Sequence, residues 1–221
     1  MRIITFGSSG EIGSVVYDEL SQNNEVIKIS SKEFVESEVK SDFLIKKLTQ
    51  TGSVDGIVWA HGVNVNDSIS DVDFNKFDQI IDANIKFILL TLKSLLGLDL
   101  INRNASLIII SSIWEKYAKR NKLSYTISKA AISGLVKSLA LDLAENEIRV
   151  NAVLPGVVDN KMTRNNLNAK QILKFEEATP GGKLINALDL AFIINFLLDP
   201  KSRGINGQSI VVDNGWSINR D

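Results

Sequence analysis

The sequence predicts an α/β fold in which helices cover both faces of a doubly wound parallel sheet. Short apolar runs alternate with longer amphipathic stretches along the chain, which is the pattern of parallel βαβ units. The apolar runs are nearly continuous, so we expect strands that are buried on both faces. The chain has 221 residues, 44% of them hydrophobic, and shows no internal repeat or interdomain linker. A single domain over residues 1–221 is therefore expected.

The order of the expected elements follows from the same pattern. Strands are expected at residues 2–6, 25–29, 55–60, 106–110, 148–153 and 209–213. Helices are expected at residues 12–22, 43–50, 74–96, 123–146 and 187–198. The segment at 31–42 has no helical pattern and leaves room for a short additional strand at 33–39. Residues 155–183 form the longest irregular region, and a substrate loop or lid is expected at about 156–183.

The charges and the rare residue types restrict the possible partners. Lys and Arg total 25 against 26 for Asp and Glu, so the net charge of -1 predicts no nucleic-acid or anionic-membrane partner. The chain has no cysteine and one histidine, which argues against a disulfide framework and a metal site. The opening MRIITFG has the pattern of a strand rather than a signal peptide, and no apolar run is long enough to span a bilayer. We therefore expect a cytoplasmic protein.

A glycine-rich loop, GSSGEIG, follows the first expected strand and leads into the first helix. Gly7, Gly10 and Gly13 permit a tight turn and the close approach of a pyrophosphate to backbone N–H groups at a helix N-terminus. The glycines could serve only as a tight connection, but the strand before them and the helix after them favour a Rossmann-like dinucleotide site. The contacts expected in this loop are Gly7, Ser8, Ser9, Glu11 and Ile12.

The end of the second strand predicts which nicotinamide cofactor is used. An NAD site usually has an acidic residue here, which binds the ribose 2′-hydroxyl. This chain instead has Ser30, Ser31 and Lys32, whose hydroxyls and cation suit a 2′-phosphate better. We therefore expect NADP(H) in preference to NAD(H). Glu33 keeps NAD(H) open, and Lys32 could also be only a solvated loop charge.

Two residues of the sequence LSYTISKAA predict acid–base chemistry. Tyr125 and Lys129 are four positions apart in an expected helix, so they share one face. A cation near a phenol favours the phenolate, which makes the tyrosine a proton donor or acceptor near neutral pH. A packed tyrosine beside a solvated lysine is the alternative. Ser111 and Ser112 end a strand thirteen residues upstream, where a hydroxyl could hold a substrate carbonyl oxygen, although serines there also form turns.

Taken in order along nearly the whole chain, these features resemble the short-chain dehydrogenase/reductase family. The motifs that carry the resemblance are GSSGEIG, WAHG at 59–62, DANI at 82–85, SSIW and YTISK, NAVLPGVV, and INGQSIVVDNGW. The resemblance implies reduction of a ketone or aldehyde, or the reverse oxidation of an alcohol, with a small-molecule substrate. A 3-oxoacyl thioester fits the core best, and a sugar or polyol fits the polar lid nearly as well. It also implies a homodimer or homotetramer.

The resemblance also implies a role for individual residues. Tyr125 would be the general acid or base, Lys129 would lower the pKa of Tyr125 and bind the nicotinamide ribose, and Ser112 would orient the substrate. Asn84 would sit where its helix opens around a water that relays protons to the lysine. Ile80, Ile81 and Ile88 independently place Asn84 near the buried face of its helix, where an amide needs partners. An asparagine that caps a local kink is the alternative. The cofactor contacts implied are Gly7, Ser8, Ser9, Glu11, Ile12, Ser30, Ser31, Lys32, Ala60, His61, Gly62, Tyr125, Lys129, Pro155, Gly156 and Val158.

Several positions depart from the family pattern. The glycines are spaced Gly-x-x-Gly-x-x-Gly, as in longer members of the family, and Glu11 occupies the position of the usual middle glycine. Asn160 replaces a threonine expected to contact the nicotinamide amide, with Thr163 as a possible substitute. Glu38 and Asp42 are candidates for the acidic residue that usually holds the adenine edge. His61 is expected to be packed and hydrogen-bonded, because no Gly-x-Ser-x-Gly nucleophile elbow accompanies it.

These departures keep two other function classes open. The altered glycine spacing and Asn160 also fit a catalytically silent NAD(P)-binding sensor with the same fold. The spacing occurs in nucleotide-sugar epimerases and dehydratases too, but the chain lacks room for their C-terminal substrate domain. An active reductase is the preferred hypothesis because Ser112, Tyr125 and Lys129 form a complete set.

Overall fold

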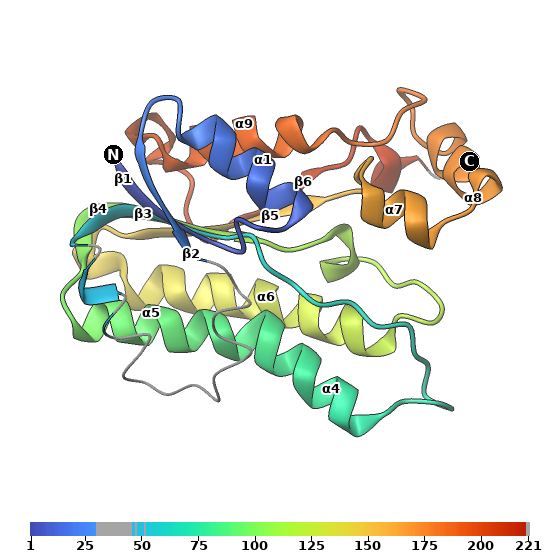
Figure 1. Ribbon diagram of the computed structural model, residues 1–221, viewed down its shortest axis with the longest axis horizontal. Coiled ribbons are helices and arrows are strands. Elements are labelled where there is room, and N and C mark those ends of the chain that lie inside the picture. The colour runs from blue at the N-terminus through green and yellow to red at the C-terminus, as the bar shows by residue number, and fades with distance from the viewer. Residues whose placement is uncertain (30–45, 47, 51, 220–221) are drawn as a thin grey trace.

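The computed structural model describes residues 1–29, 46, 48–50 and 52–219, and shows the predicted α/β fold (Figure 1). Six parallel strands form one sheet in the order β2-β1-β3-β4-β5-β6. The strands are β1 (Arg2–Phe6), β2 (Glu25–Ile29), β3 (Val54–Trp59), β4 (Ile101–Ile110), β5 (Arg149–Pro155) and β6 (Ser209–Val212). The doubly wound sheet expected from the alternating pattern is confirmed.

The strand order places a ligand-binding crevice at one point of the sheet. β1 pairs with β2 on one side and β3 on the other, with Ile4 opposite both Ile27 and Ile57. The chain thus moves outward from β1 to β2 and then returns to continue in the other direction from β3. In open α/β sheets, ligands bind beyond the carboxyl ends of the strands at such a reversal. The glycine loop follows β1 at this edge, and residues 60–62 follow β3.

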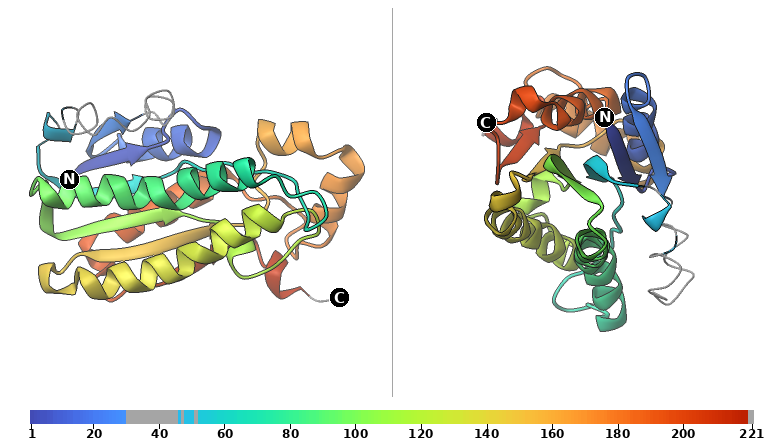
Figure 2. Two further views of the ribbon diagram at one scale, coloured as in Figure 1. Left: turned by 90° about the horizontal axis from the view of Figure 1, so that it is seen from below. Right: turned by 90° about the vertical axis from the view of Figure 1, so that its left-hand side faces the viewer.

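Helices cover both faces of the sheet, as Figures 1 and 2 show. On one face α1 and α9 lie side by side, and on the other α4, η1 and α5 form a nearly continuous rod beside α6. The bounds are α1 (Glu11–Leu20), α4 (Phe74–Ile81), η1 (Asp82–Lys86), α5 (Phe87–Gly97), α6 (Leu123–Asp142) and α9 (Ala187–Leu198). None of the described helices has the length and apolar character needed to cross a bilayer.

Two hydrophobic cores lie on the two faces of the sheet, because successive strand side chains point to opposite sides. Ile3 packs in the core under α1 and α9, whereas Ile4 packs in the core under α5 and α6. In the second core the Phe6 and Trp59 rings stack with centroids 5.9 Å apart. The indole N–H of Trp59 donates to the Thr91 hydroxyl at 2.9 Å, so the only polar atom of that ring is satisfied. These contacts fix β1 and β3 against α5 at the crevice.

The expected lid contains two short helices, α7 (Lys161–Asn166) and α8 (Ala169–Glu177), so the prediction of an irregular region was wrong there. Asn160 caps α7 by accepting a hydrogen bond from the Thr163 backbone N–H at 2.8 Å. Asn168 caps α8 in a capping box with Gln171. Short helices of this kind depend on their caps, which an apolar period does not reveal. Figure 1 shows both helices beyond the end of the sheet.

Other boundaries also differ from the prediction. β4 begins at Ile101, five residues before the expected start, because Ile101 pairs with Val54 ahead of a shift in register. Residues 102–104 are exposed, so this part of the strand lacks an apolar signature. The edge strands β2 and β6 are only partly buried, which corrects the expectation of strands buried on both faces.

Some expectations concern residues outside the described part of the chain. The extra strand expected at 33–39 and half of the helix expected at 43–50 lie outside it. The same holds for Ser30, Ser31, Lys32, Glu33, Glu38 and Asp42. The proposed phosphate corner and adenine-edge carboxylate therefore stay predictions.

Candidate active site

Ser112 and Tyr125 meet at the carboxyl edge of the sheet. Ser112 follows β4, and its hydroxyl accepts a hydrogen bond from the Trp114 backbone N–H at 3.3 Å, which begins the short helix η2 (Ile113–Glu115). Tyr125 lies in the first turn of α6. The Ser112 hydroxyl is hydrogen-bonded to the Tyr125 side chain. The two residues are therefore paired before any substrate binds.

Tyr125 is a neutral phenol in this arrangement. Burial raises the pKa of Tyr125 to about 12, although the hydrogen bond with Ser112 acts in the opposite direction. The pKa of Tyr125 thus lies above its usual value, and a lowering effect of Lys129 stays a prediction. Desolvation of the phenolate outweighs the favourable effect of its polar neighbours.

Lys129 lies one helical turn after Tyr125 and is buried. Its ammonium donates to the Ile110 backbone carbonyl at 3.2 Å and lies 5.7 Å from the centroid of the Tyr125 ring. Burial lowers the pKa of Lys129 to about 8, and the negative charge of Glu115 opposes this shift. Lys129 is thus mainly protonated at neutral pH, and a cation stands beside the phenol.

Asn84 lies in the π-helix η1, whose wider turn interrupts the rod between α4 and α5. The helix opening that the family resemblance implied is thus present, and it differs from the continuous helix expected at 74–96. The Asn84 amide donates to the Val63 carbonyl at 3.0 Å and to the Ser128 hydroxyl at 2.9 Å. Its oxygen accepts from the Val63 N–H at 2.8 Å. Both amide donors are used, so Asn84 fixes the chain after β3 against α6.

Gly62 lies in the turn beside the buried lysine. A Cβ atom at Gly62 would lie 3.5 Å from both the Asn84 side-chain oxygen and the Lys129 ammonium. Asn84 and Lys129 therefore face the same small space beside the turn. The Ser128 hydroxyl, which accepts from Asn84, donates in turn to the Tyr125 carbonyl at 2.8 Å. One hydrogen-bond network thus connects the turn after β3 with the first turns of α6.

His61 is packed and hydrogen-bonded, as expected. Its Nε2 lies 2.9 Å from the Ala83 carbonyl, which can only accept, so Nε2 carries the proton. The ring meets Phe87 edge-on, with centroids 4.4 Å apart. Nδ1 is buried without a hydrogen-bond partner among the described residues. Burial, together with the charge of Lys129, lowers the pKa of His61 to about 4, so the ring is neutral.

The glycine loop packs closely against the turn after β3. Gly7 has φ +81, and a Cβ there would lie 2.6 Å from the His61 backbone nitrogen. A Cβ at Gly13 would lie 2.2 Å from the Gly7 carbonyl oxygen, so these two positions leave no room for a side chain. Gly10 is the N-cap of α1 and offers no side chain to its first N–H groups. This end of α1 fits the phosphates of a dinucleotide.

The corner after β5 joins the sheet to the lid. A Cβ at Gly156, which follows Pro155, would lie 2.8 Å from the Cβ of Asp213. Val158 forms a parallel bridge with Ile185, which closes the base of the lid. The Asn160 side chain is engaged as the N-cap of α7. The implied cofactor contacts Pro155, Gly156 and Val158 thus lie together at the corner where the lid joins the sheet.

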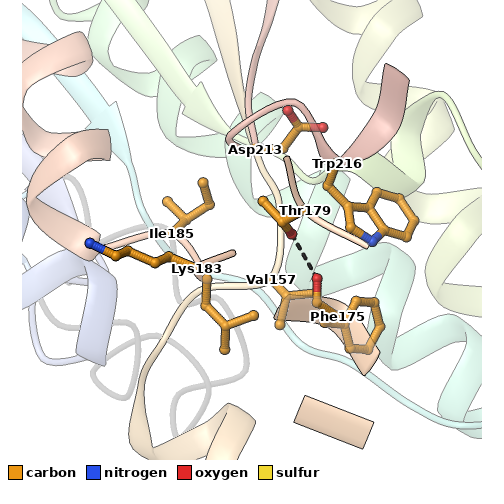
Figure 3. A pocket seen from close by; sticks show the side chains of 8 residues that line it. Val157, Phe175, Thr179, Lys183, Ile185, Asp213 and Trp216 are labelled. Atoms are coloured by element: carbon orange, nitrogen blue, oxygen red, sulfur yellow. Dashed lines mark hydrogen bonds between the residues drawn. The ribbon is translucent and has the colours of Figure 1, made fainter. Parts of the chain in front are cut away.

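Sequence reasoning missed several residues beside the site. The Glu115 carboxylate is buried, and neither oxygen has a hydrogen-bond partner in the described part of the chain. Trp114 and Trp216 meet edge-on with centroids 5.7 Å apart, and Phe175 lies 5.9 Å from Trp216. Figure 3 shows Trp216 and Phe175 with Thr179, Val157 and Ile185 around a small cavity under the lid. The two tryptophans are the last residues of two motifs already noted, SSIW and INGQSIVVDNGW. Their place in these motifs was the available signal.

Fold and site together define a class of protein. A glycine loop at the reversal of a doubly wound sheet binds dinucleotides, and a phenol between a serine and a lysine at the same edge supplies acid–base chemistry. This combination is that of a nicotinamide-dependent oxidoreductase.

Comparison with known proteins identifies the family. A family model described as enoyl-(acyl carrier protein) reductase matches residues 18–217. The uncharacterized oxidoreductase YmfI of Bacillus subtilis is 31% identical over 163 residues, which cover 74% of this chain and 67% of YmfI. The 3-oxoacyl-[acyl-carrier-protein] reductase FabG of Staphylococcus epidermidis is 28% identical over 209 residues, which cover 95% of this chain and 85% of FabG. The chain belongs to the short-chain dehydrogenase/reductase family.

Solved structures agree with this assignment. A short-chain dehydrogenase family protein from Francisella tularensis superposes with a TM-score of 0.86 at 28% identity and covers 98% of both chains. An aldohexose dehydrogenase of Thermoplasma acidophilum superposes with a TM-score of 0.87, covering 99% of this chain and 94% of the other. Its identity of 23% shows a shared fold only. The protein is accordingly an NAD(P)-dependent dehydrogenase/reductase.

Proposed function

We propose that the protein reduces a ketone or aldehyde to an alcohol, with Tyr125 as the proton donor. The observation that carries the proposal is the hydrogen-bonded pair of Ser112 and Tyr125 beside the buried ammonium of Lys129. A phenol with a pKa of about 12 is protonated at neutral pH, so Tyr125 is in the form that a proton donor requires. The similarity to FabG, named as a 3-oxoacyl reductase, supports the same direction.

The residues divide the reaction between them. When bound, the reduced nicotinamide supplies a hydride to the carbonyl carbon. The Ser112 hydroxyl holds the carbonyl oxygen, which takes the phenolic proton of Tyr125 as the C=O π electrons move onto it. Lys129 stabilises the phenolate left behind, because its ammonium lies 5.7 Å from the ring centroid. Asn84 holds the Gly62 turn beside Lys129 through its bonds to Val63. Proton return to Tyr125 completes the cycle.

The cofactor proposed is NADP(H) in preference to NAD(H). The support is the sequence at the end of β2, where Ser30, Ser31 and Lys32 replace an acidic residue. Gly7, Ser8, Ser9, Glu11 and Ile12 would hold the pyrophosphate, and Ala60, His61 and Gly62 would face the adenosine side. Pro155, Gly156 and Val158 would face the nicotinamide. A cytoplasmic location and one domain over residues 1–221 also belong to this proposal.

A homodimer or homotetramer is proposed from the exposed apolar side chains of α4, α5 and α6. Ile80, Leu92 and Leu95 are buried in the protein's own core, and Leu135 and Leu139 pack partly against it. The exposed large apolar side chains on the same helices are Phe74, Leu89, Leu96, Ile127 and Leu141. Light scattering is expected to show an oligomer, and a monomer would contradict the proposal.

The first experiment measures binding and turnover separately. Purified protein is titrated with NADPH and NADH, following nicotinamide fluorescence, and then assayed with a panel of ketones and aldehydes. Tyr125→Phe should lower kcat by about 100-fold or more because the proton donor is lost, and it should still bind the cofactor through the remaining contacts. Ser31→Asp should shift the preference from NADPH towards NADH.

The outcomes separate the competing functions. Tight NADPH binding without turnover of any carbonyl would favour the silent sensor, which the altered glycine spacing also fits. Equal turnover in Tyr125→Phe would remove Tyr125 from the mechanism. Failure to bind either nucleotide would contradict the glycine-loop interpretation and the enzymatic function with it.

A further inference from the structure

A groove with aromatic walls opens directly beside Ser112. Three segments form it: the chain from η2 onward, the end of α8, and η5 (Trp216–Ile218). The lining residues are Trp114, Tyr117, Ala118, Ala178, Trp216, Ser217 and Asn219. Its volume is about 390 Å³, within the range of small-molecule sites. The Asn219 side chain donates to the Ala178 carbonyl at 3.0 Å, which ties two of the segments together.

The groove is connected to the catalytic residues through Trp114. The Trp114 N–H donates to the Ser112 hydroxyl at 3.3 Å, so this wall of the groove begins next to the substrate-orienting serine. Lys122, outside the groove lining, lies with its ammonium 5.7 Å from the Tyr125 ring centroid, and burial, together with the charge of Lys119, lowers the pKa of Lys122. A molecule lying against Trp114 would have its near end close to Ser112, two residues earlier in the chain.

Lys119 places a positive charge beside the Trp114 wall of the groove. Its ammonium lies 4.9 Å from the Phe175 ring centroid and 5.8 Å from that of Trp114. Partial burial lowers the pKa of Lys119, and none of the ion pairs of the described residues involves it. A cation partly desolvated over aromatic rings attracts an anionic group more strongly than one in open solvent.

We propose that this groove binds the part of the substrate remote from the carbonyl, and that this part is an apolar chain ending in an anionic group. The chain would lie on the Trp114 and Trp216 rings, and the anion, a carboxylate or a phosphate, would pair with Lys119. The inference rests on the proposed carbonyl reduction only for its turnover measurements, because binding in the groove can be measured without reaction.

The turnover test uses two ketones that differ only at the far end. 2-Octanone ends in a methyl group, and 7-oxooctanoate ends in a carboxylate. With NADPH, kcat/KM for 7-oxooctanoate should be about fivefold higher, the upper end of what one exposed ion pair contributes. Lys119→Gln should abolish this preference, whereas Arg120→Gln removes an equal charge from the next residue and should preserve it. Lys119→Gln and Arg120→Gln acting alike, or no preference in the parent protein, would overturn the proposal.

The aromatic walls are tested by Trp216→Ala and, in case that variant does not fold, Trp216→Phe. The kcat/KM for both eight-carbon ketones should fall by about tenfold or more in Trp216→Ala and by less in Trp216→Phe. 2-Butanone is too short to reach the groove, so its turnover should change less than twofold. Equal losses for all three ketones would indicate a general disturbance of the site and overturn the assignment of the groove.

The binding test needs neither cofactor nor turnover. The chain has three tryptophans, and Trp59 is buried in the core, so ligand-induced changes in tryptophan fluorescence report on Trp114 and Trp216. Octanoate should bind more tightly than 1-octanol, as measured by the quenching of this fluorescence. Lys119→Gln should remove the difference in affinity. If octanoate binds in this way but no carbonyl is turned over, the proposed groove ligand is supported and the proposed reductase function is contradicted. If carbonyls are reduced but octanoate has no effect on the fluorescence, the function is supported and the groove ligand is contradicted.

Discussion

The single histidine predicts a pH dependence of stability that can be tested directly. His61 is buried as the neutral ring, with Nε2 donating to the Ala83 carbonyl and Nδ1 unpartnered among the described residues. Its pKa is about 4 in the folded protein, against 6.5 for an unperturbed histidine. On acidification the unfolded chain takes up a proton near pH 6.5, whereas the folded chain does so only near pH 4. The contribution of His61 is therefore complete above the unfolded pKa and lost as the pH falls.

The size of the effect follows from the two pKa values. One pKa unit corresponds to about 1.4 kcal/mol, so the full difference between pKa 6.5 and about 4 corresponds to roughly 3 kcal/mol. Between pH 7 and pH 5 the unfolded state gains most of its proton and the folded state almost none. The free energy of unfolding should fall by about 2 kcal/mol over this interval because of His61 alone. Carboxylates titrate mainly below this window, and the chain has no other histidine.

The assay is urea unfolding at pH 7 and pH 5, at one protein concentration, for the parent protein and His61→Gln. Glutamine keeps a polar side chain of similar reach but does not titrate. The parent should lose about 2 kcal/mol more than the variant between the two pH values. Parallel losses in both proteins would show that His61 is not held neutral, and would refute the reasoning from its burial.

Three further predictions concern the scaffold. Arg149 donates to four backbone carbonyls between Leu197 and Ile205. Arg149→Met should therefore lower the free energy of unfolding by about 3 kcal/mol. A loss below about 1 kcal/mol, measured by urea unfolding, would contradict this. Gly134→Ala should raise the Tm, because a Cβ in mid-α6 meets nothing within 4 Å and alanine favours the helix by about 1 kcal/mol. A lower Tm would instead indicate a partner subunit against that position. Gly13→Ala should weaken NADPH binding by about tenfold or more because of its clash with Gly7, and an unchanged Kd by nicotinamide fluorescence would refute the close packing of the loop.

Local patterns were sufficient for the outline of the fold and for the catalytic candidates. The apolar runs predicted the six strands found among the described residues, because each buried strand requires an apolar segment of its own. The spacing of Tyr125 and Lys129 predicted their shared helix face, and the apolar neighbours of Asn84 predicted its burial with hydrogen-bond partners. These properties depend on residues close together in sequence.

Other properties depend on segments that are distant in sequence. α7 and α8 are stabilised by Asn caps at their ends, and the start of β4 is decided by its pairing with Val54. The aromatic groove joins the chain after Ser112 to Trp216, which no local pattern connects. The sequence determined which groups could carry acid–base chemistry. Only the tertiary structure decided that the pKa of Tyr125 is raised and the pKa of Lys129 is lowered, because the cost of burying a charge depends on everything packed around it.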